Sequence, residues 1–260
     1  MDENYQTYLN RAMRLTLPET YNSQVQHIQE SAKFRPDPDK GRQAVPFPGY
    51  SIITPTTEDD PENSNLYNHL KLYQDKLVQQ LGKQIFVPVP PESFHLTLAD
   101  LIWDSAYRHA SENPTFEPQL RERVGQIFQQ CQPLADGSPI RFQVIGLMVM
   151  TRAIAVNLVP VEEFAYDRIL KFRRALYQSQ EIIGLGIEQQ YYFTPHLTLG
   201  YFGDIPPAEE LPKLSVQFVD LNQYWLDLDP QEFIVHRAEL RKFDDMTRYY
   251  RQSDWPLFKF

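Results

Sequence analysis

Two nearly identical stretches carry the side chains best suited to chemistry. Phe-His-Leu-Thr-Leu and Pro-His-Leu-Thr-Leu place their histidines at His95 and His196, which are 101 positions apart. Their alternation, with aromatic and β-branched residues, predicts two β-strands. Because side chains two apart in a strand share a face, His95 should lie beside Thr97, and His196 beside Thr198.

An imidazole next to a hydroxyl, presented twice, suits acid–base chemistry. The unperturbed pKa of histidine, about 6.5, allows the ring to accept or donate a proton near neutral pH. A neighbouring hydroxyl can donate a hydrogen bond to oxygens where negative charge develops. The leucines on the opposite face should pack into the core. We therefore expect one site made of two halves.

The surrounding elements appear in the same order in both halves. From a helix-opening proline to the histidine there are 34 residues in the first half (Pro61 to His95) and 36 in the second (Pro160 to His196). Apolar residues spaced by three or four predict the helices, and short apolar or alternating runs predict the strands. The predicted first unit, about 50–150, has strands at 50–54, 94–98 and 140–150 and helices at 63–81 and 117–131. The predicted second unit, about 152–244, has strands at 153–159, 195–199 and 233–243, a helix at 161–180 and a less regular helical segment at 207–225.

Three segments lie outside this repeat. Residues 1–49 should form an extension laid on the domain, with a helix at 4–14 and a Pro- and Gly-containing loop at 33–48. Residues 101–118 and the aromatic tail 244–260 are expected either to pack against the units or to form the rim of a cleft. The prediction is thus an N-terminal extension, 1–49, and one two-lobed domain, 50–260.

The doubled His-x-Thr pattern resembles the two-histidine (2H) phosphoesterase superfamily, which includes 2′–5′ RNA ligase-like proteins and cyclic phosphodiesterases. The branch most similar is one known as a domain of unknown function. The resemblance covers about 50–245 and includes both complete motifs and Gly200-Tyr201 after the second. It implies an α+β fold of two lobes, each a β-α-β-α-β unit, with two mainly antiparallel sheets flanking a central cleft.

The resemblance also implies roles. His95 and His196 would be the catalytic pair, and Thr97 and Thr198 would bind the phosphate. One imidazole would deprotonate water and the other would protonate the departing ribose oxygen, and such acid–base catalysis contributes about 10²–10⁴-fold. No metal or other cofactor is expected, because proton transfer itself makes the nucleophile. The expected activity is hydrolysis of a 2′,3′-cyclic or 2′–5′-linked nucleotide or RNA end.

Two alternatives use the same residues. The chain could be a non-catalytic module that binds a nucleotide or RNA end, or it could run the reaction in reverse and ligate RNA ends. The residues do not say which histidine is the base, what the true substrate is, how a cyclic phosphate opens, or whether the chain forms oligomers. A structural role for a single histidine is common, but the doubled motif favours function.

Composition limits the partners. The 260 residues are 42% hydrophobic and carry a net charge of −9, which argues against an extended nucleic-acid surface but allows a small phosphoester in a local pocket. The single cysteine, Cys131, excludes an internal disulfide and should be a partly buried, non-catalytic thiol. Neither a signal peptide nor a membrane span is apparent, so a cytoplasmic location is expected.

Other candidates carry weaker signals. The remaining histidines have no zinc-ligand spacing, and neither a P-loop nor a dinucleotide fingerprint is complete. Arginines at 152, 173 and 241 could offset substrate charge, and nothing in the sequence selects among them. Tyrosines at 191, 192, 249 and 250 should be core or rim residues, one of which could stack on a base or bond a phosphate oxygen.

Overall fold

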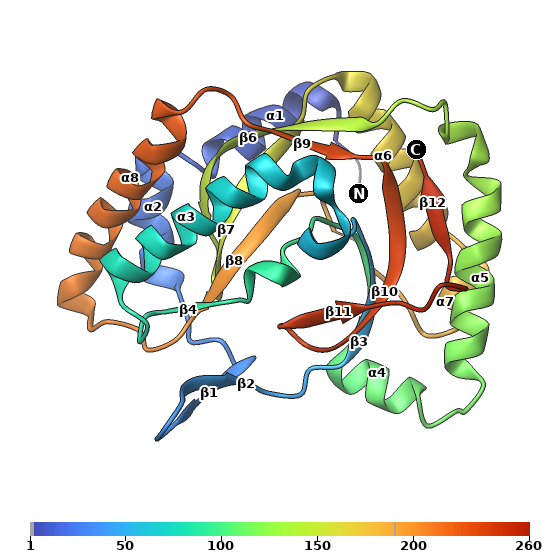
Figure 1. The fold of residues 1–260 in the computed structure, drawn as a ribbon, viewed down its shortest axis with the longest axis horizontal. Coiled ribbons are helices and arrows are strands. Elements are labelled where there is room, and N and C mark those ends of the chain that lie inside the picture. The colour runs from blue at the N-terminus through green and yellow to red at the C-terminus, as the bar shows by residue number, and fades with distance from the viewer. Residues whose placement is uncertain (1–2, 190) are drawn as a thin grey trace.

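Two antiparallel sheets organise the fold in the computed structural model, which describes residues 3–189 and 191–260 (Figure 1). The first sheet has the order β11-β10-β3-β5, with β12 also paired to β10, and the second has the order β4-β8-β7-β6-β9. Every pairing within them is antiparallel. The first sheet consists of β3 (Gly49–Ile53), β5 (Thr97–Trp103), β10 (Arg237–Asp245), β11 (Arg248–Tyr250) and β12 (Leu257–Lys259). The second consists of β4 (Phe86–Pro88), β6 (Ile140–Val149), β7 (Ala153–Pro160), β8 (His196–Phe202) and β9 (Glu232–Val235).

The central strands of the two sheets follow matching paths. In the first sheet the motif strand β5 lies beside β3, which lies beside β10. In the second sheet the motif strand β8 lies in the same way beside β7, which lies beside β6. Each sheet therefore takes its longest strand from the opposite half of the chain: β6 leaves the first half to join β7, and β10 leaves the second half to join β3. This exchange ties the halves together, because neither sheet is complete without the other half.

The strand predicted at 233–243 is wrong as a single element. The chain forms β9 on the second sheet and then β10 on the first, with His236 between them. Glu232–Val235 pairs with β6, whereas β10 pairs with β3. Apolar alternation runs through both strands, so periodicity alone does not reveal that the chain changes sheets at this point.

Helices cover the outer sides of both sheets. α3 and α8 contact β4 and β6 of the second sheet, while α5 and α6 contact β12 and β5 of the first. In Figure 1, α2, α3 and α8 lie on one side of the molecule and α5 on the other. The α-helices are α1 (Tyr5–Arg14), α2 (Pro18–Gln24), α3 (Ser64–Leu81), α4 (Asp104–Ala110), α5 (Phe116–Gln130), α6 (Glu163–Tyr177), α7 (Gln180–Ile183) and α8 (Leu211–Asp227). Among the described residues no helix is both long and apolar enough to cross a membrane.

Helix α3 shows how the sequence pattern becomes structure. Leu66, Leu70, Tyr73 and Leu77 follow one another at intervals of three or four residues, and all four are buried. The helix contacts β4 of the second sheet. The helix ends before Gly82, whose φ of 80° is a conformation that glycine adopts without steric cost. The prediction of a helix at 63–81 is confirmed to within one residue.

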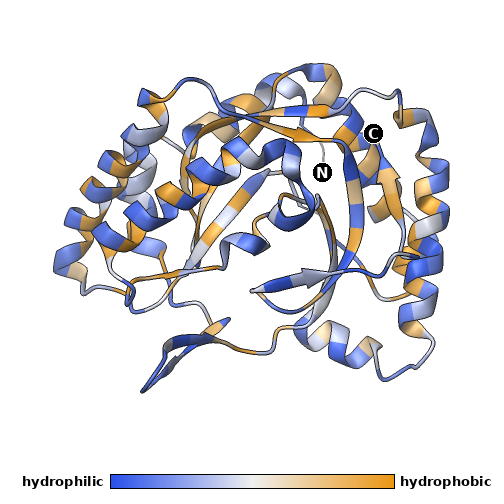
Figure 2. Ribbon diagram, in the orientation of Figure 1, coloured by the Kyte–Doolittle hydropathy of each residue, from blue (hydrophilic) through white to orange (hydrophobic). Residues whose placement is uncertain are grey.

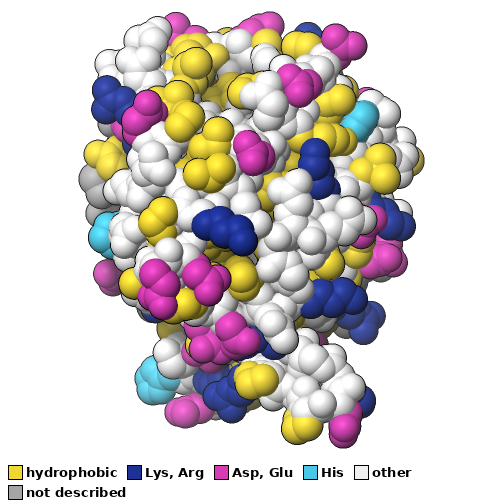
Figure 3. All heavy atoms as spheres, turned by 90° about the vertical axis from the view of Figure 1, so that its left-hand side faces the viewer, with side chains coloured by type: hydrophobic (Ala, Val, Ile, Leu, Met, Phe, Trp, Pro, Cys, Tyr) yellow, Lys and Arg dark blue, Asp and Glu magenta, His cyan; other side chains and the backbone are white. Residues whose placement is uncertain are grey.

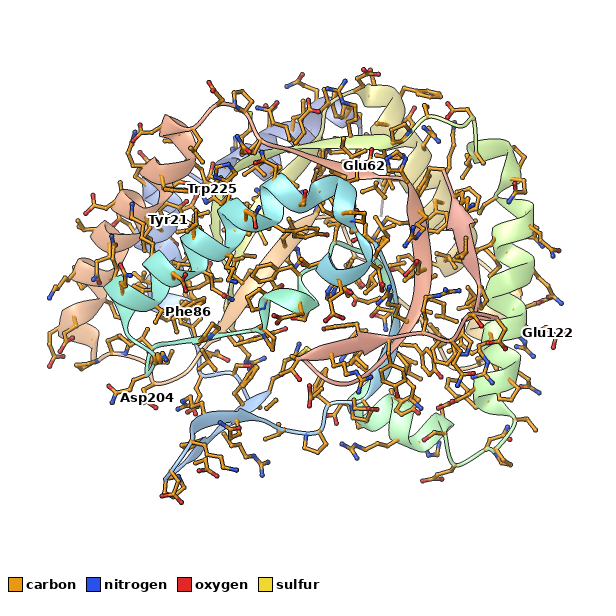
Figure 4. All side chains as sticks on the ribbon, in the orientation of Figure 1. Tyr21, Glu62, Phe86, Glu122, Asp204 and Trp225 are labelled. Carbon is orange, nitrogen blue, oxygen red and sulfur yellow. The ribbon has the colours of Figure 1, made fainter. Side chains whose placement is uncertain are left out.

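The core is continuous and rich in aromatic side chains. Tyr21 on α2 and Phe86 on β4 are fully buried, and Trp225 on α8 nearly so, whereas Glu122 on α5 is exposed to solvent (Figure 4). In Figure 2 hydrophobic colour is found on several strands of both sheets and alternates with hydrophilic colour along the helices. Cys131 belongs to this core, and burial raises the pKa of its thiol to about 11, so it stays protonated at neutral pH.

The N-terminal extension contains more structure than the sequence predicts. Residues 33–48, expected to be loop, include a hairpin of β1 (Phe34–Asp37) and β2 (Gly41–Ala44). The turn is closed by the Asp37 carboxylate, which accepts hydrogen bonds from the backbone of Asp39 and Lys40. Proline is tolerated in this two-stranded piece because it lies at a sheet edge.

The extension is hydrogen-bonded to β7 of the second sheet. Tyr8 donates a hydrogen bond to the Leu158 carbonyl, and the Asn157 amide donates one to Ala12. Figure 3 looks onto the side formed by α8 and α2, where exposed hydrophobic side chains are interspersed with polar and charged ones. Val216 and Leu226 are the exposed hydrophobic residues of α8.

Candidate functional site

The two His-Thr motifs meet at the centre of the molecule. Leu96 and Leu197, the middle residues of the two motifs, form an antiparallel β-bridge between the two sheets. In each motif the histidine and the threonine flank this leucine. The first regular strand begins only at Thr97, later than predicted, whereas β8 begins at His196 as expected to within one residue.

A cavity of about 810 Å³ opens over this junction. His95, Thr97, His196 and Thr198 all line it. The four side chains are only partly buried, whereas both leucines between them are completely buried. The motifs therefore present their polar faces to one common space, as the alternation predicts.

The two histidines are oriented in the same way. His95 Nδ1 lies 2.7 Å from the Ser93 carbonyl oxygen, and His196 Nδ1 lies 2.7 Å from the Thr194 carbonyl oxygen. A carbonyl can only accept a hydrogen bond, so in each ring Nδ1 must carry the proton and donate it. The lone pair of the neutral ring is then on Nε2. Both rings are fixed in one tautomer by a carbonyl two residues earlier.

The surroundings favour neutral imidazoles. Burial lowers the pKa of His95 to about 4, opposed by the Ser93 hydrogen bond and by the negative charge of Asp100. Burial also lowers the pKa of His196, and the Thr194 hydrogen bond and Asp100 again oppose it. An anion bound between the rings would stabilise their charged forms and raise both pKa values.

The threonine hydroxyls are available to a ligand. Among residues 3–189 and 191–260, neither Thr97 Oγ1 nor Thr198 Oγ1 has a hydrogen-bond partner within the protein. Both threonines line the cavity. Their hydroxyls are therefore free to donate a hydrogen bond to a ligand bound there.

Matching irregularities follow the two threonines. The pairing of β5 with β3 shifts between Thr97 and Ala99, and the pairing of β8 with β7 shifts between Thr198 and Gly200. A bulge moves the next inward side chain by one position. Asp100 and Tyr201, each three residues after its threonine, consequently join the cavity wall. Strict alternation would have placed neither beside its threonine.

Asp100 is held by two hydroxyl groups. Tyr191 donates to its Oδ2 over 2.6 Å, and Ser51 donates to its Oδ1 over 3.2 Å. Its charge acts on both histidines, since it raises the pKa of each. Sequence reasoning missed Asp100, and no local signal marks the bulge that brings it into the site.

The tail and the N-terminal extension complete the wall. Tyr249 of β11 packs on His95, with ring centroids 4.2 Å apart and planes tilted by 54°. Lys33 and Phe47 of the extension line the cavity on the side of Tyr201. The tail thus supplies a cleft residue, one of the two roles that the sequence left open for it. Lys33 was missed because residues 33–48 were expected to be a loop of an extension laid on the domain.

The other candidates divide between the cavity and the core. Arg152 lines the cavity. Arg173 and Arg241 are buried: Arg173 donates to the Leu98 carbonyl, and Arg241 pairs with Glu239 at 2.7 Å. Histidines 27, 69, 109 and 236 and tyrosines 191, 192 and 250 are not among the residues lining this cavity. Within the described parts of the chain, no three His, Cys, Asp or Glu side chains gather as a metal-ligand set.

Comparison with known proteins agrees with this architecture. Residues 37–129, which include the first motif, match a family model of 2H phosphodiesterase type described as "Domain of unknown function (DUF1868)". The crystal structure of the conserved protein of unknown function ATU0111 from Agrobacterium tumefaciens C58 has the same fold: TM-score 0.53, 13% identity, covering 89% of this chain and 96% of that chain. No curated protein sequence matches significantly.

Two further solved structures are more distant. Escherichia coli LigT, crystallised with 3′-AMP, has a TM-score of 0.41 and 14% identity, covering 81% of this chain and 97% of that chain. TT0787 of Thermus thermophilus has a TM-score of 0.42 and 16% identity, covering 81% and 96% respectively. The matched family segment contains the first motif, and the second motif lines the same cavity from outside that segment.

Proposed function

We propose that the protein is a phosphoesterase that hydrolyses a 2′,3′-cyclic or 2′–5′-linked nucleotide or RNA end without a metal. One observation carries this proposal: two imidazoles with identical backbone hydrogen bonds and two unpartnered threonine hydroxyls line the same cavity. Such a set supplies a base, an acid and two hydrogen-bond donors around one phosphorus atom. The catalytic pair would be His95 and His196.

The reaction requires two proton transfers. The Nε2 lone pair of one neutral histidine accepts a proton from water as the water oxygen bonds to phosphorus. The other histidine, protonated, donates its Nε2 proton to the ribose oxygen as the bond between that oxygen and phosphorus breaks. Positions on opposite sides of the phosphorus suit an in-line displacement, and the two rings exchange roles when the reaction runs backwards.

Charge develops on the non-bridging oxygens during this displacement. Thr97 and Thr198 would donate hydrogen bonds to these oxygens, where preorganised donors contribute most. The bound anion would also offset the effect of burial on the histidine pKa values, so that one ring can hold a proton at neutral pH. The substrate itself would help to set the protonation state needed for its own reaction.

The cavity fits a small ligand rather than a long polymer. A volume of about 810 Å³ lies within the usual range for small-molecule sites. Its wall includes Trp103, Tyr201 and Tyr249, whose rings offer surfaces on which a nucleobase can stack. A nucleotide or the terminal nucleotide of a short RNA end is therefore the substrate class we favour.

The test is direct. The purified protein is incubated in EDTA with 2′,3′-cyclic mononucleotides and with short 2′–5′-linked oligonucleotides, and products are separated by chromatography. We expect a phosphomonoester product from wild type and from H109A, whose exposed histidine lies outside the cavity, and no product from the H95A/H196A double variant. Full activity in the double variant would overturn the assignment.

The same assay separates the alternatives. A binding module would show calorimetric binding of the nucleotide with no product from any phosphoester in the panel. A ligase would join a 2′,3′-cyclic phosphate end to a 5′-hydroxyl end. Loss of wild-type turnover in EDTA, restored by added divalent metal, would contradict the metal-free mechanism.

A further inference from the structure

A segment of the N-terminal extension, residues 29–47, connects the two sheets beside the cavity. At one end the backbone amides of Gln29 and Ser31 donate hydrogen bonds to the carbonyls of Thr151, between β6 and β7, and of Phe202, at the end of β8. Both belong to the second sheet or its turns. At the other end the Phe47 amide donates to the Asp244 carbonyl on β10 of the first sheet. We call this segment the strap. Its ends are therefore bonded to both sheets.

The strap places one amine in the cavity wall. Lys33 lines the same cavity as His196 and Thr198. Its Nζ lies 4.7 Å from the ring centroid of Phe47 and 5.0 Å from that of Tyr201. The Lys33 carbonyl accepts a hydrogen bond from Val45, which holds the strap against itself at this point. The rings of Phe47 and Tyr201 therefore hold the ammonium group, and the backbone hydrogen bond to Val45 holds the residue that carries it.

Lys33 differs from the other charged residues of the cavity wall. The Arg152 guanidinium donates to Gln29, the exposed Glu30 pairs with Arg42, and Asp100 accepts two hydroxyl hydrogen bonds. Among the residues that the structure describes, no carboxylate lies within ion-pair distance of Lys33.

An amine taken out of water without a counter-ion is costly. Burial lowers the pKa of Lys33 to about 8, against the opposing influence of Asp100. The group is still mostly charged at pH 7. An anion entering the cavity would supply the partner that the protein does not.

We propose that Lys33 is an anion-binding residue that selects charged ligands at the His196 side of the cavity. The inference rests on the proposed function, because it takes the bound anion to be the phosphoryl group held by the two motifs. Lys33 attracts a dianion more strongly than a monoanion. It should therefore favour the phosphomonoester product over the cyclic diester, and both over an uncharged nucleoside.

Three variants test this inference. K33M keeps most of the side-chain length and the aromatic contacts but removes the charge, and K33R keeps the charge. K40M is the matched control, because Lys40 is an exposed lysine of the same strap. Calorimetry at pH 7 measures binding of adenosine 2′-monophosphate and adenosine to each protein, and binding of 2′,3′-cyclic AMP to each protein in an H95A background, in which the cyclic nucleotide should not be turned over. Thermal unfolding checks that each variant folds.

The expected result is graded by charge. K33M should weaken binding of adenosine 2′-monophosphate by about 10-fold or more, as removal of a hydrogen bond to a charged group does. The loss should be smaller for 2′,3′-cyclic AMP and absent for adenosine. K33R and K40M should bind all three ligands within a few-fold of wild type.

The failures are distinguishable. If wild type binds the nucleotides and K33M binds them equally well, the role of Lys33 is wrong while the two-histidine function stands. If K33M weakens adenosine as much as the monophosphate, Lys33 contributes packing and not charge recognition, which also overturns the inference. If wild type binds neither nucleotide, the inference and the proposed function fall together.

Discussion

The two halves of the cavity are alike in their motifs and unlike in their walls. His95 and His196 have the same backbone hydrogen bond, and each is followed by a threonine and a bulge. The position three residues after the threonine is Asp100 in one half and Tyr201 in the other. Tyr249 packs on His95, whereas the charge of Lys33 acts on His196.

This difference corresponds to the two demands on such a site. An in-line displacement needs a proton acceptor on one side of the phosphorus and a donor on the other, and two equivalent imidazoles meet that need. A 2′,3′-cyclic nucleotide, one of the proposed substrates, carries its nucleoside on one side of the phosphorus only, so the two walls would be expected to differ. Under the proposed function, the repeated groups would serve the reaction and the unrepeated ones would serve recognition.

Removing either imidazole should have the largest effect. H95A and H196A should each lower kcat for a 2′,3′-cyclic mononucleotide by about 10²–10⁴-fold, because each ring moves one of the two protons. H109A should retain full activity. If only one of the two cavity variants loses activity, the halves do not share the chemistry.

The threonines should follow. T97V and T198V keep the shape of the side chain but remove the hydroxyl, and each should lower kcat by about 10²-fold, as loss of one transition-state donor does. Threonine-to-serine variants should stay within a few-fold of wild type in the same assay. Unequal losses would show which half holds the more highly charged oxygen.

Burial of the histidines should also appear in stability. The pKa of His95 is lowered to about 4 in the folded state, so between pH 6.5 and 4 the unfolded chain binds this proton first. Stability should therefore rise with pH through this window and fall on acidification, by up to about 3 kcal/mol from His95. Urea unfolding at pH 7.5 and 4.5 should show a smaller acid loss for H95Q than for wild type. An equal loss would mean that His95 is not buried as described.

The smallest effect should come from Asp100 and Tyr201, the two residues that differ between the halves of the cavity. Asp100 raises the pKa of both histidines, so D100N should lower both and move both limbs of the kcat/KM profile to lower pH, by less than about one unit. Y201F changes the equivalent position without changing charge and should leave the profile where it is. A shift of equal size in Y201F would argue that packing, and not charge, sets the profile.

Much of this architecture is readable from local pattern. The helix at Ser64–Leu81 follows from apolar spacing and a terminal glycine, and the doubled motif predicts that His95, Thr97, His196 and Thr198 share one space. These features depend on residues close in sequence, where periodicity decides which side chains share a face.

What the sequence does not reveal depends on distant pairing. The bulge that turns Asp100 inward is set by the register with β3, and the break at His236 by two strands pairing with different sheets. Lys33 reaches the cavity because the strap is bonded to carbonyls far along the chain. None of these leaves a periodic signal in its own segment.

Two strands from different parts of the chain should form a single anion site. Imidazole resonances of His95 and His196, assigned with H95Q and H196Q, can be followed by NMR as inorganic phosphate is added. Both rings should respond with one common dissociation constant, and both pKa values should rise. A response from one ring only, or two separate dissociation constants, would contradict it.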